Sequence, residues 1–304
     1  MSIRHPSSSS SMGIGEVAEP PFAVLPNADR LFARRSERFS ELAGQTALEP
    51  YLQFLAQLSG IQHELAAITP EPPPSLPRAR PPLCMELTLS ADMSDWEPAD
   101  HCVRSFCERL ASADTTTPIR SALASLLAAS PRQRRALAGA ALLGTPEPED
   151  VAPCVLAVAG LQPLFTRLAS VLDLDELRQH HNDRTCPACG GPPAVSSVVG
   201  WPRAANTRFC ACSLCGTQWH VVRIKCLMCG EHGGIGYLTL EGDTRSSVKA
   251  ETCDGCGHYV KILYQVDDPG LEPVADDVAT AGLDIKLETD GWCRGGRNPF
   301  LLGY

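Results

Sequence analysis

The sequence predicts an α+β protein: an all-helical N-terminal domain, then two tandem four-cysteine modules, then a C-terminal helix. The first half is rich in Ala and Leu at helical spacing, whereas short β-branched runs and four CxxC pairs follow Thr185. The cysteine pattern repeats once, because Cys226 follows Cys186 by 40 positions and Cys253 follows Cys212 by 41. The predicted segments are a disordered tail (1–26), the helical domain (27–181), the first module (182–224), the second module (225–268), and the C-terminal helix and tail (269–304).

The first predicted helix follows Asn27, a good N-cap residue. Phe32 and Phe39 belong to its apolar stripe, and Arg35 and Arg38 to its polar face. This spacing is typical of an amphipathic helix that buries one side.

The same periodicity predicts the other helices of this domain. A proline-dense arm over 70–82 interrupts them, because proline fixes φ and removes a backbone donor. The expected helices are 49–68, 97–112, 118–129, 131–143, 149–161 and 163–180.

Composition and charge exclude several classes of protein. The net charge of −9 argues against general nucleic-acid binding, which needs clustered Lys and Arg. No run approaches the roughly twenty apolar residues of a membrane span, so membrane insertion is not expected. The N-terminus lacks the apolar segment of a secretory signal, so we expect a cytoplasmic protein whose 14 cysteines meet a reducing environment.

The four CxxC pairs predict two metal sites. Two such turns, each with both sulfurs pointing the same way, complete a tetrahedron around one ion. The matched spacing favours metal binding over disulfides or redox-active pairs, and sequential pairing is the simplest arrangement. Tetrahedral sulfur suits both zinc and the mononuclear iron of rubredoxin-like sites, and the spacing does not choose between them. The predicted ligands are Cys186, Cys189, Cys212 and Cys215 for the first site, and Cys226, Cys229, Cys253 and Cys256 for the second.

The residues between the second and third CxxC pairs, 216–225, are predicted to form one extended strand shared by both modules. It would hold the two sites in a fixed relation and present Trp219, His220 and Arg223 as a recognition surface, because Trp and Arg are frequent at interface hot spots.

The other cysteines and histidines give no catalytic arrangement. Cys210 is expected to be a packed or free thiol, since four ligands already close a site. His220 lacks a recognisable orienting carboxylate, and the chain has no nucleophile elbow, phosphate-binding loop or HExxH helix. We therefore expect no enzyme activity. The cysteines without partners at ligand spacing are interpreted as structural; they are Cys84, Cys102, Cys107, Cys154 and Cys293.

With these residues identified, the C-terminal region resembles the formate dehydrogenase accessory protein family FdhE. The resemblance covers nearly all of 185–304, and all eight CxxC cysteines fall on the family pattern. The segments that carry it are CPACGGPP, TQWHVVRIKC, KAETCDGCG, YVKILYQ, EPVADDVATAGLDI and NPFLL.

The resemblance implies a cytoplasmic maturation factor or chaperone that is needed for respiratory formate dehydrogenase activity. It implies contact with the catalytic subunit before export, iron in rubredoxin-like sites in preference to zinc, and two small zinc-ribbon-like modules. Two other functions stay open: a rubredoxin-like electron-transfer protein and a nucleic-acid-binding double zinc ribbon. The nucleic-acid-binding function is disfavoured because residues 183–264 hold eight basic and six acidic residues, a balance that is a weak basis for phosphate binding.

Overall fold

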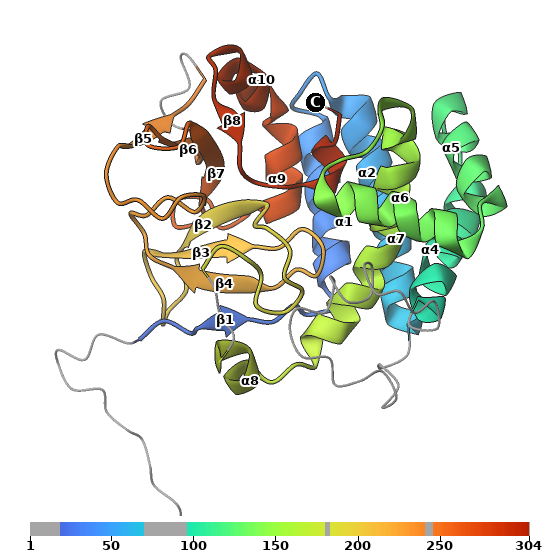
Figure 1. Ribbon diagram of the computed structural model, residues 1–304, viewed down its shortest axis with the longest axis horizontal. Helices are drawn as coiled ribbons and strands as arrows, with labels where there is room; N and C mark the ends of the chain where they lie inside the picture. The colour runs from blue at the N-terminus through green and yellow to red at the C-terminus, as the bar shows by residue number, and fades with distance from the viewer. Residues whose placement is uncertain (1–18, 70–95, 180–182, 241–245, 304) are drawn as a thin grey trace, which may run out of the picture.

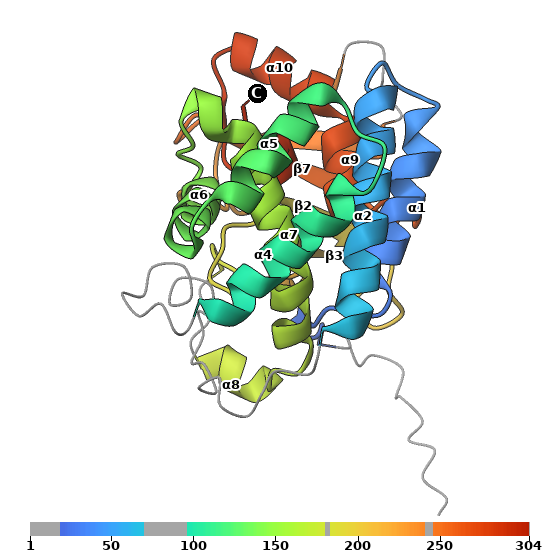
Figure 2. The ribbon, with the colours of Figure 1, turned by 90° about the vertical axis from the view of Figure 1, so that its right-hand side faces the viewer.

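The computed structural model describes residues 19–69, 96–179, 183–240 and 246–303. Most of the helices gather on one side of the molecule and an eight-stranded sheet forms the other, with α9 (Pro273–Ala279) between the sheet and α1 (Figure 1). Figure 2, turned by 90°, shows the helices in front of the sheet. The predicted fold class is confirmed: a helical N-terminal region precedes a sheet-containing region with two four-cysteine clusters and C-terminal helices.

The helices of the first half are α1 (Leu31–Ala43), α2 (Glu49–Ile68), α4 (Glu97–Ala111), α5 (Thr117–Ala128), α6 (Pro131–Leu143), α7 (Val151–Ser170) and α8 (Leu174–Gln179). The strands are β1 (Ala23–Val24), β2 (Val195–Val199), β3 (Thr207–Ala211), β4 (Gln218–Val221), β5 (Ile235–Leu238), β6 (Val248–Cys253), β7 (His258–Tyr264) and β8 (Cys293–Arg294). The second half also contains α9, α10 (Ala281–Thr289) and a short 3-10 helix, Pro299–Leu301; another, Pro148–Asp150, precedes α7.

The central helix α7 continues through Pro163, where the sequence predicted a break between two helices. Proline lacks an N–H, so the carbonyl of Ala159, four residues earlier, loses its helical donor. The side chain of Gln62 on α2 replaces it, with Nε2 donating to Ala159 O at 2.8 Å. The prediction of a break was wrong because a buried amide from another helix satisfies the carbonyl that proline leaves free.

Among the described residues, one helical segment, Pro148–Ser170, is long and apolar enough to cross a membrane. Its apolar window is 78% buried inside the protein, as is usual for a core helix.

We expect the substitution Gly160→Ala to push α7 and α4 apart and so to lower the stability of the fold. A Cβ at this position would lie 2.8 Å from the backbone Cα of Val103, which cannot swing aside. Overpacking of this kind lowers the free energy of unfolding by about 1–3 kcal/mol. The matched control is Gly139→Ala on α6, where a Cβ meets nothing within 4 Å and should be neutral or stabilise by up to about 1 kcal/mol. Equal losses for both variants in urea unfolding would contradict this packing.

Helix α1 differs from its prediction in two respects. It begins at Leu31, and Asn27 caps the turn just before it, with Oδ1 accepting the Asp29 N–H at 3.1 Å and the carbonyl accepting the Leu31 N–H at 2.9 Å. Arg35, expected on the exposed face, is only 1% exposed and pairs with Glu272 at 3.2 Å. The physical reason is that the polar face of α1 packs against the C-terminal region.

Part of the predicted tail over 1–26 is ordered. Ala23 and Val24 form β1, which pairs antiparallel with β4 and adds a strand to that edge of the sheet. Residues 1–18 lie outside the described part of the chain, as do the proline-dense arm at 70–82 and the predicted helix end at His180.

One sheet spans both cysteine modules. Its strand order is β1-β4-β3-β2-β7-β6-β5, with β8 beside β7. Strands β2 to β4 and β5 to β7 each form an antiparallel group, and the parallel pair of β2 and β7 joins them. The shared strand predicted over 216–225 is confined to β4 and ends at Val221. The parallel pair, rather than a common strand, therefore sets the relation between the two modules.

A buried ion pair reinforces this junction. Arg208 on β3 and Glu251 on β6 lie 2.8 Å apart, with side chains 0% and 4% exposed. The same guanidinium donates to the carbonyls of Arg223 at 3.3 Å and Lys225 at 3.2 Å. Arg208 thus fixes the segment that leads from the first module into the second.

A second buried ionic cluster attaches α9 and α10 to the sheet. Lys261 on β7 lies 3.2 Å from Asp277 of α9 and 2.5 Å from Asp284 of α10. Arg294 on β8 pairs with both carboxylates, at 2.7 Å from Asp277 Oδ2. The C-terminal helices are held by charge pairs as well as by apolar contact.

Candidate metal centres

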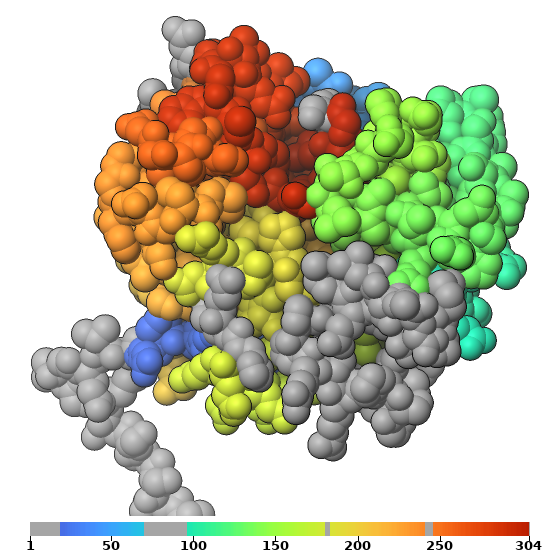
Figure 3. Space-filling model, viewed as in Figure 1, coloured from blue at the N-terminus to red at the C-terminus, as the bar shows by residue number. Residues whose placement is uncertain are grey.

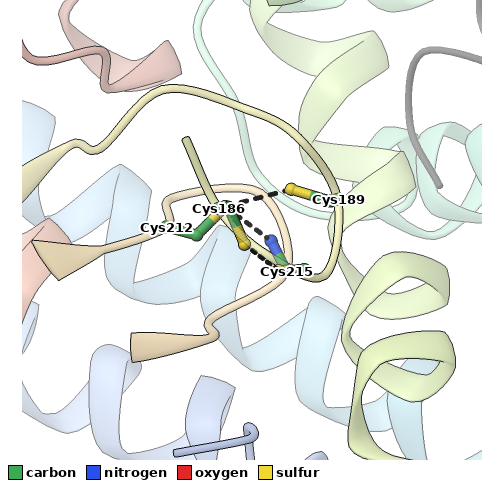
Figure 4. Close-up of side chains that lie close together, drawn as sticks. All are labelled: Cys186, Cys189, Cys212 and Cys215. Carbon is green, nitrogen blue, oxygen red and sulfur yellow. Dashed lines mark hydrogen bonds between the residues drawn. The ribbon is translucent and has the colours of Figure 1, made fainter. Parts of the chain in front are cut away.

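Site 1 consists of Cys186, Cys189, Cys212 and Cys215. Their sulfurs lie within 4.8 Å of one another, with Cys186 and Cys215 at 3.5 Å and Cys189 and Cys212 at 3.3 Å. Figure 4 shows the four side chains converging from two facing loops. A tetrahedral ion with metal–sulfur bonds of about 2.3 Å requires sulfurs about 3.8 Å apart, close to this spacing.

Site 2 consists of Cys226, Cys229, Cys253 and Cys256, and repeats this arrangement. Its sulfurs also lie within 4.8 Å of one another, with Cys226 and Cys256 at 3.7 Å and Cys229 and Cys253 at 3.7 Å. The structure therefore brings the eight cysteines together in the two predicted sets, and both clusters fit metal binding.

The same backbone turn follows the first cysteine of every CxxC pair. In each turn the N–H of a glycine donates to the carbonyl of the first cysteine, and the glycine has positive φ, which residues with a Cβ rarely adopt. This geometry explains why glycine follows each pair. The four glycines are Gly190, Gly216, Gly230 and Gly257.

Hydrogen bonds from distant elements support the Cys212 turn of site 1. Gln162 on α7 donates from Nε2 to Ser213 O at 2.7 Å, and Ser213 donates from Oγ to Arg297 O at 2.9 Å. Thr217 Oγ1 lies 3.2 Å from Cys215 Sγ, where a hydroxyl can donate to a thiolate. A buried glutamine in an otherwise apolar helix was a signal that sequence reasoning did not use.

The electrostatics of site 1 favour a cation. Burial raises the pKa of the Cys186 thiol well above its usual value, whereas hydrogen bonds from Cys186, Cys189 and Cys215 lower the pKa of Cys212 well below it. The protein thus favours a thiolate at a position with no access to water. A buried negative charge is costly unless it is paired, and a divalent ion would supply the pairing.

The pKa values of two thiols in site 2 are also shifted in opposite directions. A backbone hydrogen bond from Glu231 lowers the pKa of Cys229, while desolvation raises the pKa of Cys256 to about 12. The pKa values of the two thiols are therefore shifted in opposite directions although their chemistry is the same. A shared metal ion would bind both as thiolates and release the proton.

The cysteines outside the two clusters occupy separate places. Cys210 on β3 is fully buried, and burial raises its pKa to about 12. Cys293 on β8 is exposed, whereas Cys84 falls within the undescribed range 70–95. The other three lie in helices: Cys102 and Cys107 on α4, and Cys154 on α7.

The predicted recognition residues have different environments. Trp219 is fully buried and donates from Nε1 to Asp183 O at 2.9 Å, so its expected exposure was wrong. It is buried because it packs in the main apolar cluster, which also contains Ala23 of β1. His220 is half-buried with its ring against Phe209, and burial lowers its pKa. Arg223 is exposed.

Three family models match consecutive parts of the chain. They describe the N-terminal part of FdhE at residues 20–182, its central domain at 185–223 and its C-terminal domain at 224–301.

Curated relatives and a solved structure cover nearly the whole chain. A protein FdhE homolog from Rhizobium meliloti (strain 1021) is 38% identical over 296 residues, covering 96% of both chains. Protein FdhE from Escherichia coli O9:H4 (strain HS) is 33% identical over 293 residues, covering 93% of this chain and 91% of the relative. The crystal structure of the FdhE protein from Pseudomonas aeruginosa matches with a TM-score of 0.81 at 31% identity, covering 93% of this chain and 99% of that one.

Proposed function

Because the chain belongs to the FdhE family of formate dehydrogenase maturation proteins, we propose that it binds the catalytic subunit of a formate dehydrogenase in the cytoplasm and holds iron in both four-cysteine sites. The observation that carries this proposal is the pair of four-sulfur clusters fixed within one sheet of an FdhE fold. We propose a role in binding and maturation rather than catalysis of a reaction on a small molecule.

The choice of iron over zinc follows from the family resemblance. Thiolate sulfur in tetrahedral arrangement accepts either ion, so the geometry alone does not decide. The eight cysteines of sites 1 and 2 would hold the ions, and iron would supply a one-electron redox couple there.

The segment between β4 and site 2 supports a contact surface for the catalytic subunit. Val222 and Ile224 are 49% and 58% exposed, and they flank the exposed Arg223. Arginine is enriched at interface hot spots, and apolar side chains beside it can exclude water from such a contact. Hydrogen bonds from Arg208 hold the backbone of this segment, so its exposed side chains sit on a fixed support. We define residues 222–224 as the linker surface.

We expect the double substitution of Val222 and Ile224 by Glu to weaken co-purification of the catalytic subunit about tenfold or more, because each buried charge would oppose an apolar contact. Metal content should not change, since neither side chain is a ligand. The matched control is Ile68→Glu, which places the same charge on α2 at a position 63% exposed. If Ile68→Glu weakened binding as much as the double substitution, the linker surface would not be a specific contact surface for the catalytic subunit.

The genetic test of the function is deletion of the gene. Formate dehydrogenase activity should be lost while the polypeptide of the catalytic subunit stays detectable. Full activity in the deletion strain would overturn the maturation proposal. Electron transfer would then be the better account, with the partly exposed sulfurs of site 2 as the point of contact.

A further inference from the structure

The two clusters differ in how deeply the protein buries their sulfurs. The four cysteines of site 1 are 0–3% exposed. In site 2, Cys226 and Cys253 are buried, but Cys229 and Cys256 are only half-buried. Each CxxC pair of site 2 therefore leaves its second cysteine within reach of solvent.

Site 1 is part of the main hydrophobic core. Its cysteines pack in one cluster with side chains of α2, α4 and α7. Gln162 of α7 holds the Cys212 turn, and Leu31 of α1 packs so tightly against Gly216 that an added Cβ would lie 2.5 Å from it. Figure 4 shows a helix running beside the cluster. Opening site 1 would therefore disturb the helical half of the molecule.

The four cysteines of site 2 lie outside that core, because none of them belongs to the apolar clusters found among the described residues. Only its first turn reaches the core, through Leu227 and Met228. Polar groups contact the backbone of both turns: exposed Arg184 donates to Cys229 O at 3.0 Å, and the His258 ring lies 2.8 Å from Cys256 O. The neighbouring Asp254 and Gly255 are exposed. In Figure 3 the segment that holds this site, coloured orange, lies on the flank opposite the green helices of the first half.

We propose that the two centres have different roles: site 1 holds a permanent structural metal, and site 2 holds an exchangeable metal that a small chelator or thiol can reach. The inference rests on the proposed metal binding at both sites and adds a division of labour between them. The second module, rather than the first, is then where metal is taken up or lost during the working life of the protein.

The exchange step at site 2 needs no oxidant or reductant. A donor atom of the chelator forms a bond to the metal as the sulfur of Cys229 or Cys256 leaves it, and that thiolate takes up a proton from solvent. Repetition at the remaining sulfurs transfers the ion with its charge unchanged. At site 1 the same attack requires local opening of the core, and the free energy of such opening approaches that of global unfolding.

Metal release to excess EDTA from the whole metal-loaded protein tests this proposal. We expect two phases of one equivalent each, with the first faster by about tenfold or more. Replacing both Cys226 and Cys229 with alanine should remove the fast phase and leave the slow one. Hydrogen exchange in α7 should stay protected after the fast phase, because site 1 and the core would be intact. The control is Cys293→Ser, which removes the exposed cysteine on β8 and should leave both phases unchanged.

Loss of both equivalents in one phase would overturn the division of roles. So would a fast phase that persists when Cys226 and Cys229 are both replaced with alanine, since the labile metal would then belong to site 1. Protein that holds no metal even after anaerobic loading would instead contradict the proposed metal binding itself. The two failures are therefore distinguishable.

Discussion

Replacing Cys212 and Cys215 with alanine is expected to unfold much of the protein, including helices far from site 1 in sequence. The variant loses two ligands and its metal, and binding of a structural metal supplies on the order of 10 kcal/mol of folding free energy. That loss is comparable with the whole stability of a typical domain, about 5–15 kcal/mol. Because site 1 packs with α2, α4 and α7, the loss should spread through the shared core. Far-UV circular dichroism and thermal unfolding measure it.

The matched variant replaces Cys226 and Cys229 with alanine. It should lose the metal of site 2 and loosen the second module, while the helical half keeps its protection against proteolysis. The difference follows from the packing, since none of the four cysteines of site 2 belongs to the apolar clusters of the described residues, whereas all four of site 1 do. Unchanged metal content and unchanged protease resistance in this variant would contradict the ligand assignment.

The second large effect is expected for Lys261→Met. Lys261 and Asp277 are both 0% exposed, so the substitution leaves a buried carboxylate with one cation fewer. Breaking a buried pair in this way costs about 3–5 kcal/mol. Lys286→Met is the matched control: its partner Asp290 lies on the same helical surface, the two side chains are 56% and 42% exposed, and such pairs contribute about 0.5 kcal/mol. Urea unfolding that gave equal losses for both would contradict the role of the buried cluster.

The pH dependence of that loss has a defined sign. Burial raises the pKa of Asp277, but Arg294 and Lys261 lower it by more, so its pKa in the folded protein lies below the usual value. The ion pairs therefore stabilise the fold fully above the unfolded-state pKa of about 3.9 and lose this effect as pH falls through the folded value. The gap in stability between wild type and Lys261→Met should narrow in acid. Metal loss at low pH affects both proteins and does not change the comparison.

The grouping of the eight cysteines into two four-sulfur clusters was the part of the structure that the sequence predicted best, for a local reason. A CxxC pair followed by glycine specifies a turn through its own backbone, and the repeated spacing leaves sequential pairing as the simplest arrangement. The structure groups the sulfurs in that way. Helices with clear apolar periodicity, such as α2 and α6, were also predicted with their observed bounds.

The features that escaped prediction depend on contacts between distant segments. The continuity of α7 through Pro163 requires Gln62, about a hundred residues earlier, and no local pattern shows that it is available. Arg35 appeared to belong to a solvated face because its partner Glu272 lies 237 positions away. Trp219 packs in the same apolar cluster as its pairing partner Ala23, which lies in a segment assigned to a disordered tail. Sequence patterns place such residues on the surface of the protein, because the pattern does not show their distant partners.

The parallel pairing of β2 and β7 is a further feature that could not be predicted from local sequence, in this case a feature of the sheet topology. Each module alone predicts a small antiparallel ribbon, and nothing in either ribbon specifies that its edge pairs with the other. The pairing joins the two clusters within one sheet. It makes the relation between the metal sites a property of the whole fold.

The most direct test of the account is a metal count on gently prepared, anaerobically purified protein. Plasma mass spectrometry should find about two metal ions per chain, because each tetrahedral site consumes four of the eight clustered cysteines. If the ions are iron, as proposed, protein exposed to air should be red. Two equivalents of iron would support both the sites and the choice of metal. One equivalent or none would contradict the central claim that this fold is built around two metal centres.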